Sequence, residues 1–460
     1  MPLAFSFNAS ANGPDPYPEY SEIIDELQNL ANQHNNIMTM EVIGHTWQDR
    51  DIWSVKISDN VLVDEDEPEV LYIGAHHGNE LPSALICSRI IEHLVSNYTL
   101  DGRATGLVNE RELFFIPLLN PDGYHQSIHY SSQRKNMKDN GDGTFGVDLN
   151  RNYDYMWGVS GTSTSTSDYN YGGPYPASEP EVRTIKNFTG KHNFTIALSY
   201  HSYGELVLYP WGYDHVAPEG EELLSALADN IAAPMRYTPG QASDPDVGMY
   251  DASGDYCDWA YHEHGVNAFT VEMGTSHSPG KQQLAAVLGQ NLEGALVAAE
   301  LAGNPEDSLL PQWTVMLYMA GDNDLNEEVQ KDMNELEDAD RTDEVNTICL
   351  VDLQYQGDTK LYQIEKDQYG LSNTNIISTE LDDNGSVIPE NDELWMNEAE
   401  NLANFVNWTV DNYPAQHYLL VIWDHGKGLI KGMCKDKAYY MKPLDLQRAL
   451  ANIPLSLIHI

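Results

Sequence analysis

Four residues of this 460-residue chain have the side chains that a water-activating metal site requires. His77 and Glu80 lie three residues apart, His201 follows in the segment SYHSY, and Glu272 follows in FTVEM. Two imidazoles and one carboxylate form a ligand set for zinc that leaves a position open for water, and a further carboxylate can act as a base. A single His-x-x-Glu pair also fits an ordinary loop histidine and a helix-start acid, so the flanking sequence must decide.

The flanking segments place these residues at the ends of predicted strands. Residues 70–75 form a continuous apolar run, which is typical of a buried strand, and residues 81–95 continue with apolar positions at helical spacing. The apolar runs 196–200 and 269–273 predict two further strands, which carry the second histidine and the second glutamate. Sites in open α/β sheets lie at the carboxyl ends of strands, so we expect three strand ends to converge on one metal ion.

Residues 17–302 resemble the zinc metallocarboxypeptidase family, most closely its carboxypeptidase T-like branch. Besides the metal-site segments, the motifs that carry the resemblance are DIW with KISDN, NPDG, RKN, DLNRNY, SY with LYPWG, and DWAY, in that order. The resemblance implies a mixed-sheet α/β domain of the phosphorylase/hydrolase-like type. It also implies an enzyme that hydrolyses amino acids from the free carboxyl end of peptides.

The resemblance implies a role for each matching position. His77, Glu80 and His201 match the ligands of a single zinc ion, Glu272 matches the general base and acid, and Arg134 matches the residue that helps to polarise the scissile carbonyl. The matching substrate-binding positions are Asn150, Arg151, Tyr250, Tyr203 and Asp255.

Four of these positions suit a chain end and its side chain. A guanidinium binds both oxygens of a carboxylate in one plane, so Arg151 with Asn150 is predicted to hold the terminal carboxylate, and Tyr250 matches the mobile tyrosine that closes over substrate. Asp255 matches an acid that lets a mostly apolar pocket also accept Lys or Arg, which predicts a broad preference. A solvated turn residue is the alternative for Asp255.

An acidic run precedes the first ligand strand. Asp64, Glu65, Glu67 and Glu69 are closely spaced carboxylates of the kind that calcium prefers, and similar acidic loops bind calcium in the carboxypeptidase T-like branch. On such an acidic chain a solvated charge run is the alternative. We therefore expect one zinc ion and consider calcium as a second cofactor.

Composition restricts the partners of the chain. With 71 Asp and Glu against 24 Lys and Arg, the formal net charge is -47, which opposes binding to nucleic acid and to anionic membranes. No segment resembles a transmembrane span, and we expect a monomer that acts on peptides. The first 18 residues lack the basic start and apolar core of a signal peptide, although the family resemblance implies secretion. The four cysteines are too few and too scattered for a disulfide framework, and Cys87 and Cys349 are predicted to be buried thiols.

A second α/β pattern begins after turn residues near position 303. Strands are expected at 313–320, 345–353 and 417–423, and helices at 323–339 and 399–412. This half resembles the amino-terminal part of the clostripain-like cysteine peptidases, with their caspase-type sheet, most clearly in YLLVIWDHG. His425 matches the family's catalytic histidine, whereas Cys434 follows too soon to match its nucleophile, so His425 is interpreted as vestigial in this chain.

The predicted organisation therefore has five parts: an N-terminal tail (1–16), a zinc carboxypeptidase domain (17–302), a linker (303–312), an incomplete caspase-like domain (313–453) and an artefactual tail (454–460). Two other functions were weighed. An amidase of the same fold would act on cell-wall peptides, but the retained carboxylate-binding residues oppose it. A cysteine endopeptidase truncated before its nucleophile is opposed by the intact zinc set.

Overall fold

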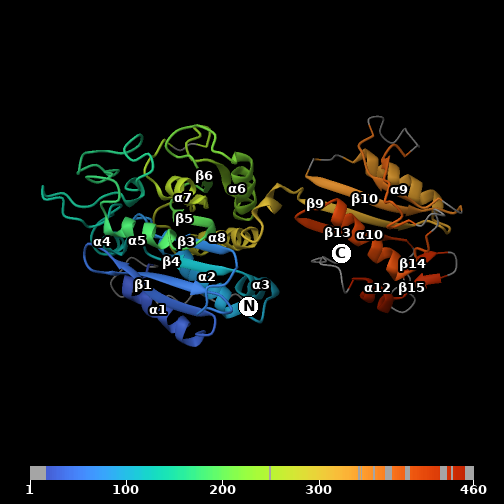
Figure 1. Cartoon of the computed structure of the whole chain (residues 1–460), viewed down its shortest axis with the longest axis horizontal. Helices are drawn as coiled ribbons and strands as arrows, with labels where there is room; N and C mark the ends of the chain where they lie inside the picture. The colour runs from blue at the N-terminus through green and yellow to red at the C-terminus, as the bar shows by residue number, and fades with distance from the viewer. Residues whose placement is uncertain are drawn as a thin grey trace. The chain divides into compact units, whose positions relative to one another are not determined.

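The structure of the protein, a computed structural model, describes residues 17–247, 250–339, 342, 344–355, 358–367, 376–388, 394–424, 433–436 and 439–450. The chain divides into two compact units, Met1–Ser308 and Leu309–Ile460 (Figure 1). Each unit is described by itself below.

In the described part of the first unit, eight strands form one mixed sheet in the order β1-β2-β4-β3-β5-β8-β6-β7. The strands are β1 (Met38–His45), β2 (Asp51–Ile57), β3 (Glu69–Ile73), β4 (Glu112–Ile116), β5 (Phe194–His201), β6 (Leu206–Tyr209), β7 (Thr238–Gln241) and β8 (Asn267–Glu272). The central strands β4, β3, β5 and β8 are parallel to one another, and antiparallel partners flank them on both sides. The carboxyl ends of β3, β5 and β8 therefore meet at one edge of the sheet.

Helices cover both faces of this sheet (Figure 1). They are α1 (Tyr20–Gln33), α2 (Ser83–Asn97), α3 (Gly102–Glu110), α4 (Pro121–His129), α5 (Pro180–Thr189), α6 (Glu221–Met235), α7 (Tyr256–His264) and α8 (Lys281–Leu301). Because side chains alternate along a strand, Val70 and Tyr72 of β3 pack in a core with α1, α2, α6 and α8, whereas Leu71 and Ile73 pack in a second core with α5 and α7. A strand buried on both faces explains the continuous apolar run in the sequence.

The predicted elements around the metal-site residues agree with this fold. The runs 70–75, 196–200 and 269–273 correspond to β3, β5 and β8, and the helical spacing over 81–95 corresponds to α2. The predicted mixed-sheet α/β class is confirmed.

One helix departs from the expectation that no segment resembles a transmembrane span. Among the described residues, α8 is long and apolar enough to cross a membrane by length and composition, but 56% of its most apolar window is buried inside the protein. Its apolar residues pack in the same core as α2 and α6, which is the position of a core helix in a folded domain.

In the second unit, the described residues form a five-stranded sheet in the order β12-β11-β10-β9-β13, with β10, β9 and β13 parallel. The elements are β9 (Trp313–Ala320), α9 (Asn326–Asp338), β10 (Val345–Asp352), β11 (Lys360–Gln363), β12 (Thr379–Glu380), α10 (Ala399–Asn412), β13 (His417–Trp423), β14 (Met433–Asp436), β15 (Tyr439–Met441) and α12 (Pro443–Leu450). The strands expected at 313–320, 345–353 and 417–423 and the helices expected at 323–339 and 399–412 are present. Cys434 belongs to β14, which pairs with β15 in a separate two-stranded sheet, and His425 lies outside the described residues.

Candidate active site

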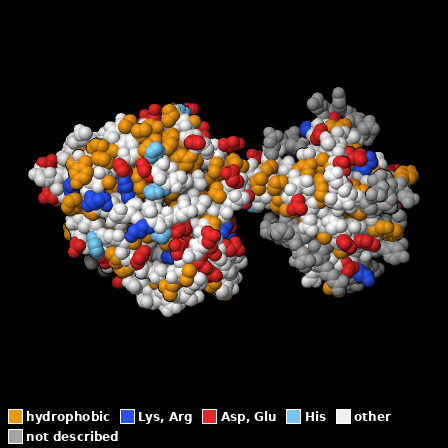
Figure 2. Space-filling model, viewed as in Figure 1, with side chains coloured by type: hydrophobic (Ala, Val, Ile, Leu, Met, Phe, Trp, Pro, Cys, Tyr) orange, Lys and Arg blue, Asp and Glu red, His pale blue; other side chains and the backbone are white. Residues whose placement is uncertain are grey.

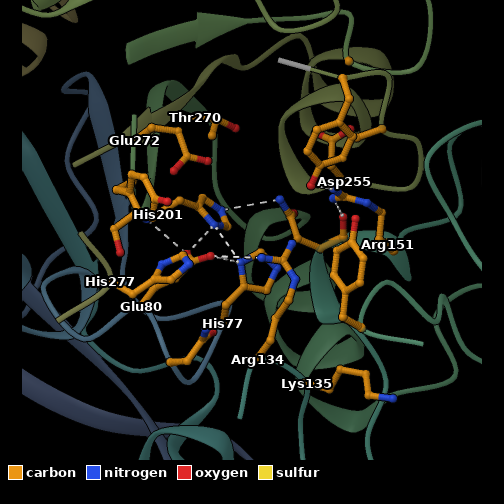
Figure 3. A pocket seen from close by; sticks show the side chains of 18 of the residues that line it. His77, Glu80, Arg134, Lys135, Arg151, His201, Asp255, Thr270, Glu272 and His277 are labelled. Atoms are coloured by element: carbon orange, nitrogen blue, oxygen red, sulfur yellow. Dashed lines mark hydrogen bonds and ion pairs between the residues drawn. The ribbon is translucent and has the colours of Figure 1, made fainter. Parts of the chain in front are cut away.

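Four predicted site residues come together at the carboxyl edge of the first sheet (Figure 3). His77 and Glu80 lie in the loop between β3 and α2, and His201 and Glu272 are the last residues of β5 and β8. His201 is paired directly with Glu272 in the parallel register of these two strands. The sheet thus places His201 and Glu272 side by side, although they are distant in the sequence.

The side chains of His77, Glu80 and His201 converge on one point. The Nδ1 atom of His77 lies 2.8 Å from Oε1 of Glu80, and Nδ1 of His201 lies 3.0 Å from Oε2 of the same carboxylate. The two Nδ1 atoms are 3.1 Å apart, all three residues are buried, and their ligand atoms lie within 4.8 Å of one another. Two imidazole nitrogens and a carboxylate that face one buried point fit the preferences of zinc.

A surrounding network orients the two imidazoles. The Nε2 atom of His77 lies 3.0 Å from Oδ1 of Asp148, and Nε2 of His201 lies 3.1 Å from Oγ of Ser199. An N–H donated outwards from Nε2 leaves Nδ1 as the lone-pair atom that faces a metal. Arg134 donates from Nε to Oδ2 of Asp148 and from Nη1 to Oε1 of Glu80, both at 3.0 Å.

Asp148 is a buried residue of this network that the sequence interpretation did not assign to the site. Burial would raise the pKa of Asp148, but the neighbouring Arg134 guanidinium, and after it the His77 imidazole, hold it well below the usual range. The carboxylate is therefore ionised and links the ligand His77 to Arg134. Asp148 is the first residue of the motif DLNRNY and lies two residues before Asn150. This position is the sequence signal for Asp148, although the resemblance assigns only substrate-binding residues to the motif.

Glu272 has a different electrostatic environment from the ligand Glu80. Burial, followed by the negative charge of Glu80, raises the pKa of Glu272 to about 7. For Glu80, burial has the same direction, but the neighbouring His77 and His201 hold its pKa well below the usual range. A carboxyl group that titrates near neutrality can accept a proton and return it, which is the property of a general base and acid.

These residues line a cavity of about 670 Å³ whose opposite wall carries the predicted substrate-binding residues (Figure 3). Asn150 and Arg151 belong to a short 3₁₀ helix, Leu149–Arg151, and Asp148 accepts from the backbone N–H of Asn150 at its start. The Nδ2 atom of Asn150 lies 3.4 Å from Nε2 of His201, so the 3₁₀ helix is directly beside the ligand set.

Arg151 is buried, with 4% of its surface exposed. Its guanidinium donates to the carbonyl oxygen of Asn150 at 2.6 Å and to the hydroxyl of Tyr250 at 3.2 Å, and the Tyr250 ring lies 5.8 Å from it. Among the described residues, no carboxylate forms an ion pair with Arg151. A buried cation whose hydrogen-bond partners are neutral can bind an anion in the cavity.

Asp255 lies in the same cavity wall as Arg151 (Figure 3). It is the N-cap of α7 and accepts at Oδ1 from the backbone N–H of Asp258 at 3.0 Å, while its buried Oδ2 has no hydrogen-bond partner. Burial raises the pKa of Asp255. Because Asp255 is only 7% exposed, the alternative of a solvated turn residue is wrong.

Tyr203 and Tyr250 lie at the mouth of the cavity, where they are 53% and 47% exposed. The ring of Tyr203 makes an edge contact with His277, with centroids 4.9 Å apart. Both tyrosines therefore have room to contact a bound peptide, and the exposure of Tyr250 fits a side chain that closes over substrate.

The acidic run does not form the single calcium site that was considered. Ligand atoms of Glu65 and Glu67 lie near Asp59, whereas those of Asp64 and Glu69 lie near Glu112, so the four carboxylates divide between two groups. The carboxylate of Glu69 is already paired, because Oε1 lies 2.8 Å from Nδ1 of His192. Calcium binding by these four residues together is therefore not supported.

Comparison with known proteins agrees with this geometry. The model of the zinc carboxypeptidase family matches residues 23–294, and the chain belongs to that family. The clostripain family model matches residues 317–454 of the second unit. The resemblances to the zinc carboxypeptidase and clostripain families are thus confirmed.

Individual relatives cover the first unit. A zinc carboxypeptidase of Saccharothrix mutabilis subsp. capreolus is 31% identical over 276 residues, which are 57% of this chain and 63% of the relative. Carboxypeptidase B of Rattus norvegicus is 28% identical over 277 residues, which are 58% of this chain and 65% of the relative. The chain therefore spans somewhat less than two thirds of the length of these relatives.

Two crystal structures share the fold of the first unit. Carboxypeptidase A from Helicoverpa armigera has a TM-score of 0.56 and 25% identity, and the match covers 62% of this chain and 74% of that one. Thrombin activatable fibrinolysis inhibitor has a TM-score of 0.59 and 23% identity, with 63% and 75% covered.

Proposed function

We propose that the chain is a zinc-dependent carboxypeptidase that removes single residues from the free carboxyl end of peptides. The observation that carries this proposal is the joint presence, in one cavity, of the His77–Glu80–His201 ligand set and the buried Arg151 without a carboxylate partner. The first group can hold a hydrolytic metal, and the second can hold the charged end of a chain. Membership of the zinc carboxypeptidase family supports the same function.

The proposed chemistry divides between the metal and the protein. When bound, zinc would lower the pKa of a water molecule and polarise the scissile carbonyl. Glu272 takes the proton of the attacking water and returns it to the leaving amine, for which its raised pKa suits it. Arg134, which Asp148 and Glu80 hold in place, donates to the carbonyl oxygen as that oxygen gains negative charge.

The residues across the cavity from the metal-ligand set determine where the substrate lies. Arg151 and Asn150 bind the terminal carboxylate, and Tyr250 closes over it from the mouth of the cavity. This arrangement places the last peptide bond, rather than an internal one, beside the ligand set. A free carboxyl terminus is therefore the feature that distinguishes a substrate.

The proposed side-chain preference is broad. Asp255 presents an unpartnered carboxylate oxygen in a cavity that Thr270 and Ala252 also line. A basic side chain would give Asp255 a charge partner and oppose the effect of burial on its pKa, whereas the raised pKa lowers the cost of placing an apolar side chain beside it. We propose acceptance of both apolar and basic terminal residues, and action outside the cell, as the family resemblance implies.

Chelation and zinc add-back on matched peptides test this function. One peptide carries a free carboxyl end, and its control has the same sequence with an amidated end. We expect hydrolysis of the free peptide to stop after chelation and to return with Zn²⁺, and the amidated peptide to remain intact. Equal cleavage of both peptides would exclude an exopeptidase, and full activity after verified metal removal would exclude a metal-dependent reaction.

A further inference from the structure

A second group of metal-ligating side chains lies away from the active site, between α1 and α4. His125 and His129 are on α4, and Glu19 is the residue at the N-terminal cap of α1. The Nε2 atom of His129 lies 2.7 Å from Oε2 of Glu19, and the rings of His125 and His129 have centroids 4.4 Å apart. One ligand atom from each of the three residues lies within 4.8 Å of the other two.

The spacing on α4 explains why the two imidazoles meet. Residues four apart share one face of a helix, so His125 and His129 project side by side towards the start of α1. Among the groups of ligating side chains that the described residues form outside the active site, this is the one that contains histidine. The other groups contain carboxylates alone, which are common on an acidic surface without any ion.

We propose that Glu19, His125 and His129 bind a divalent transition-metal cation, for which Zn²⁺ is the best match, at a site separate from the active site. Two imidazole nitrogens and one carboxylate oxygen form a mixed nitrogen and oxygen set, which favours zinc and its neighbours over calcium or magnesium. Tetrahedral ligands at about 2.1 Å from zinc are about 3.4 Å apart, so side-chain rotations suffice to close the set around an ion.

The local charges permit a cation at this position. Burial, and after it the positive charge of Arg50, lowers the pKa of His125. The guanidinium of Arg50 lies 2.6 Å from Oδ1 of the buried Asp122. Asp122 offsets part of the positive charge of Arg50, and Glu19 supplies a negative charge to the set. The side chains of Glu19 and His129 are 21% and 19% exposed, so an ion has access from solvent.

Metal binding at this position would join two elements that support the active site. Tyr124 of α4 already donates to the carbonyl oxygen of Pro18, directly before Glu19. At the other end of α4, the N-cap Asn120 donates to the carbonyl oxygen of His76, next to the ligand His77. An ion at the α1–α4 site would stabilise the start of the domain against the helix that supports the ligand loop.

Zinc stoichiometry tests the proposal in the full chain. Protein is dialysed against Zn²⁺ and then against metal-free buffer, and bound zinc is measured by elemental analysis. We expect H125A/H129A to hold one equivalent less than the unmodified protein. The difference is independent of the proposed function, because a failure of the active site to bind zinc would lower both values equally. H45A is the matched control, since His45 pairs with Asp51 at 3.0 Å on the same unit without a second histidine.

Spectroscopy and stability give independent readings. Co²⁺ bound by the α1–α4 site should give a visible d–d band that H125A/H129A lacks and H45A retains. Zn²⁺ should raise the Tm of the unmodified protein and of H45A by a few degrees more than that of the double variant. H125N keeps the His129–Glu19 pair, so it tests metal binding if the double variant misfolds. Equal zinc content in the unmodified protein and in correctly folded H125N and H125A/H129A would overturn the site and leave an ion pair only.

Discussion

At the residue scale, environment separates two glutamates that share one cavity. Glu80 lies between two histidines that hold its pKa well below the usual range, so it is a permanent anion suited to a cation. Glu272 lies at the next strand end, where burial raises its pKa to about 7. The same side chain is thus suited to binding metal at one position and to moving a proton at the other.

Replacement of Glu272 by Gln tests the second role. E272Q has nearly the same size but cannot accept a proton, so we expect kcat to fall by at least about 10²–10⁴, the usual contribution of a general base. Bound zinc should be unchanged, because the three ligands remain. Elemental analysis and steady-state kinetics on one preparation provide the check, and near-normal turnover would remove Glu272 from the mechanism.

The pH dependence of kcat/KM tests the same group without mutation. Glu272 acts when deprotonated, so activity should fall as pH decreases through its pKa. Burial raises that pKa from 4.5 to about 7, and a cation held by the neighbouring ligands lowers it again. We expect an acid limb with an apparent pKa between 4.5 and 7. A profile that stays flat down to pH 4.5 would contradict this assignment.

Arg151 carries the prediction for the chain end. R151A removes the buried guanidinium beside Tyr250 in the cavity, so we expect kcat/KM for peptides with a free carboxyl end to fall by about 10²–10⁴. R89A is a suitable control, because Arg89 pairs with Glu92 on α2 and does not line the cavity. If R151A and R89A cleave such peptides equally well, Arg151 does not bind the terminal carboxylate.

At the element scale, hydrophobic periodicity and family motifs were sufficient to predict the strands that carry the site. Buried parallel strands leave continuous apolar runs, and these located β3, β5 and β8 to within a few residues. Contacts between distant segments leave no such pattern. The ion pairs that connect His77, Asp148 and Arg134 join the loop after β3 to the long loop after α4, and only the folded chain shows them.

The sequence did not indicate that the acidic run is divided between two groups, because that division also depends on contacts with distant segments. Sequence proximity suggested one site for Asp64, Glu65, Glu67 and Glu69. The partners that divide them, including His192 and Glu112, are distant in the chain. Glu179 and Glu181 at the start of α5 are fully buried, a position that local sequence also did not indicate.

The burial of Glu181 gives a stability prediction for α5. Burial raises its pKa to about 8 from 4.5, and its Oε1 has no hydrogen-bond partner. The folded state therefore binds a proton more tightly than the unfolded state, so stability from this group is complete below pH 4.5 and decreases as pH rises through about 8. E181Q keeps an acceptor for Asn136 and removes the titration.

We expect E181Q to be more stable than the unmodified protein above pH 8, by on the order of 2–4 kcal/mol, and to differ little at pH 5. Denaturant unfolding at the two pH values measures the difference. E335Q is a control, because Glu335 is an exposed residue of α9 whose side chain is 55% accessible. A stability difference for E181Q that does not change with pH would contradict a buried titration.

At the scale of the whole molecule, the two units are similar in surface charge and in having buried cysteines. They differ in the sites that they contain. Acidic side chains are spread over the visible surface of both units (Figure 2), in agreement with the net charge of -47. In the described part of the second unit, β13 pairs with β9 alone and forms an edge of the sheet. The zinc ligand set and its cavity belong entirely to the first unit.

Thiol alkylation tests whether peptide hydrolysis by this chain depends on a cysteine. Cys87, Cys257 and Cys349 are buried, and burial raises the pKa of Cys87 and Cys257, which keeps both unreactive. The catalytic residues proposed above include no cysteine, and the sequence offers no match for the clostripain-type nucleophile. We therefore expect iodoacetamide to leave the release of carboxyl-terminal residues unchanged, while chelation abolishes it. Cleavage of internal bonds that survives chelation and stops on alkylation would instead assign a cysteine peptidase to the second unit.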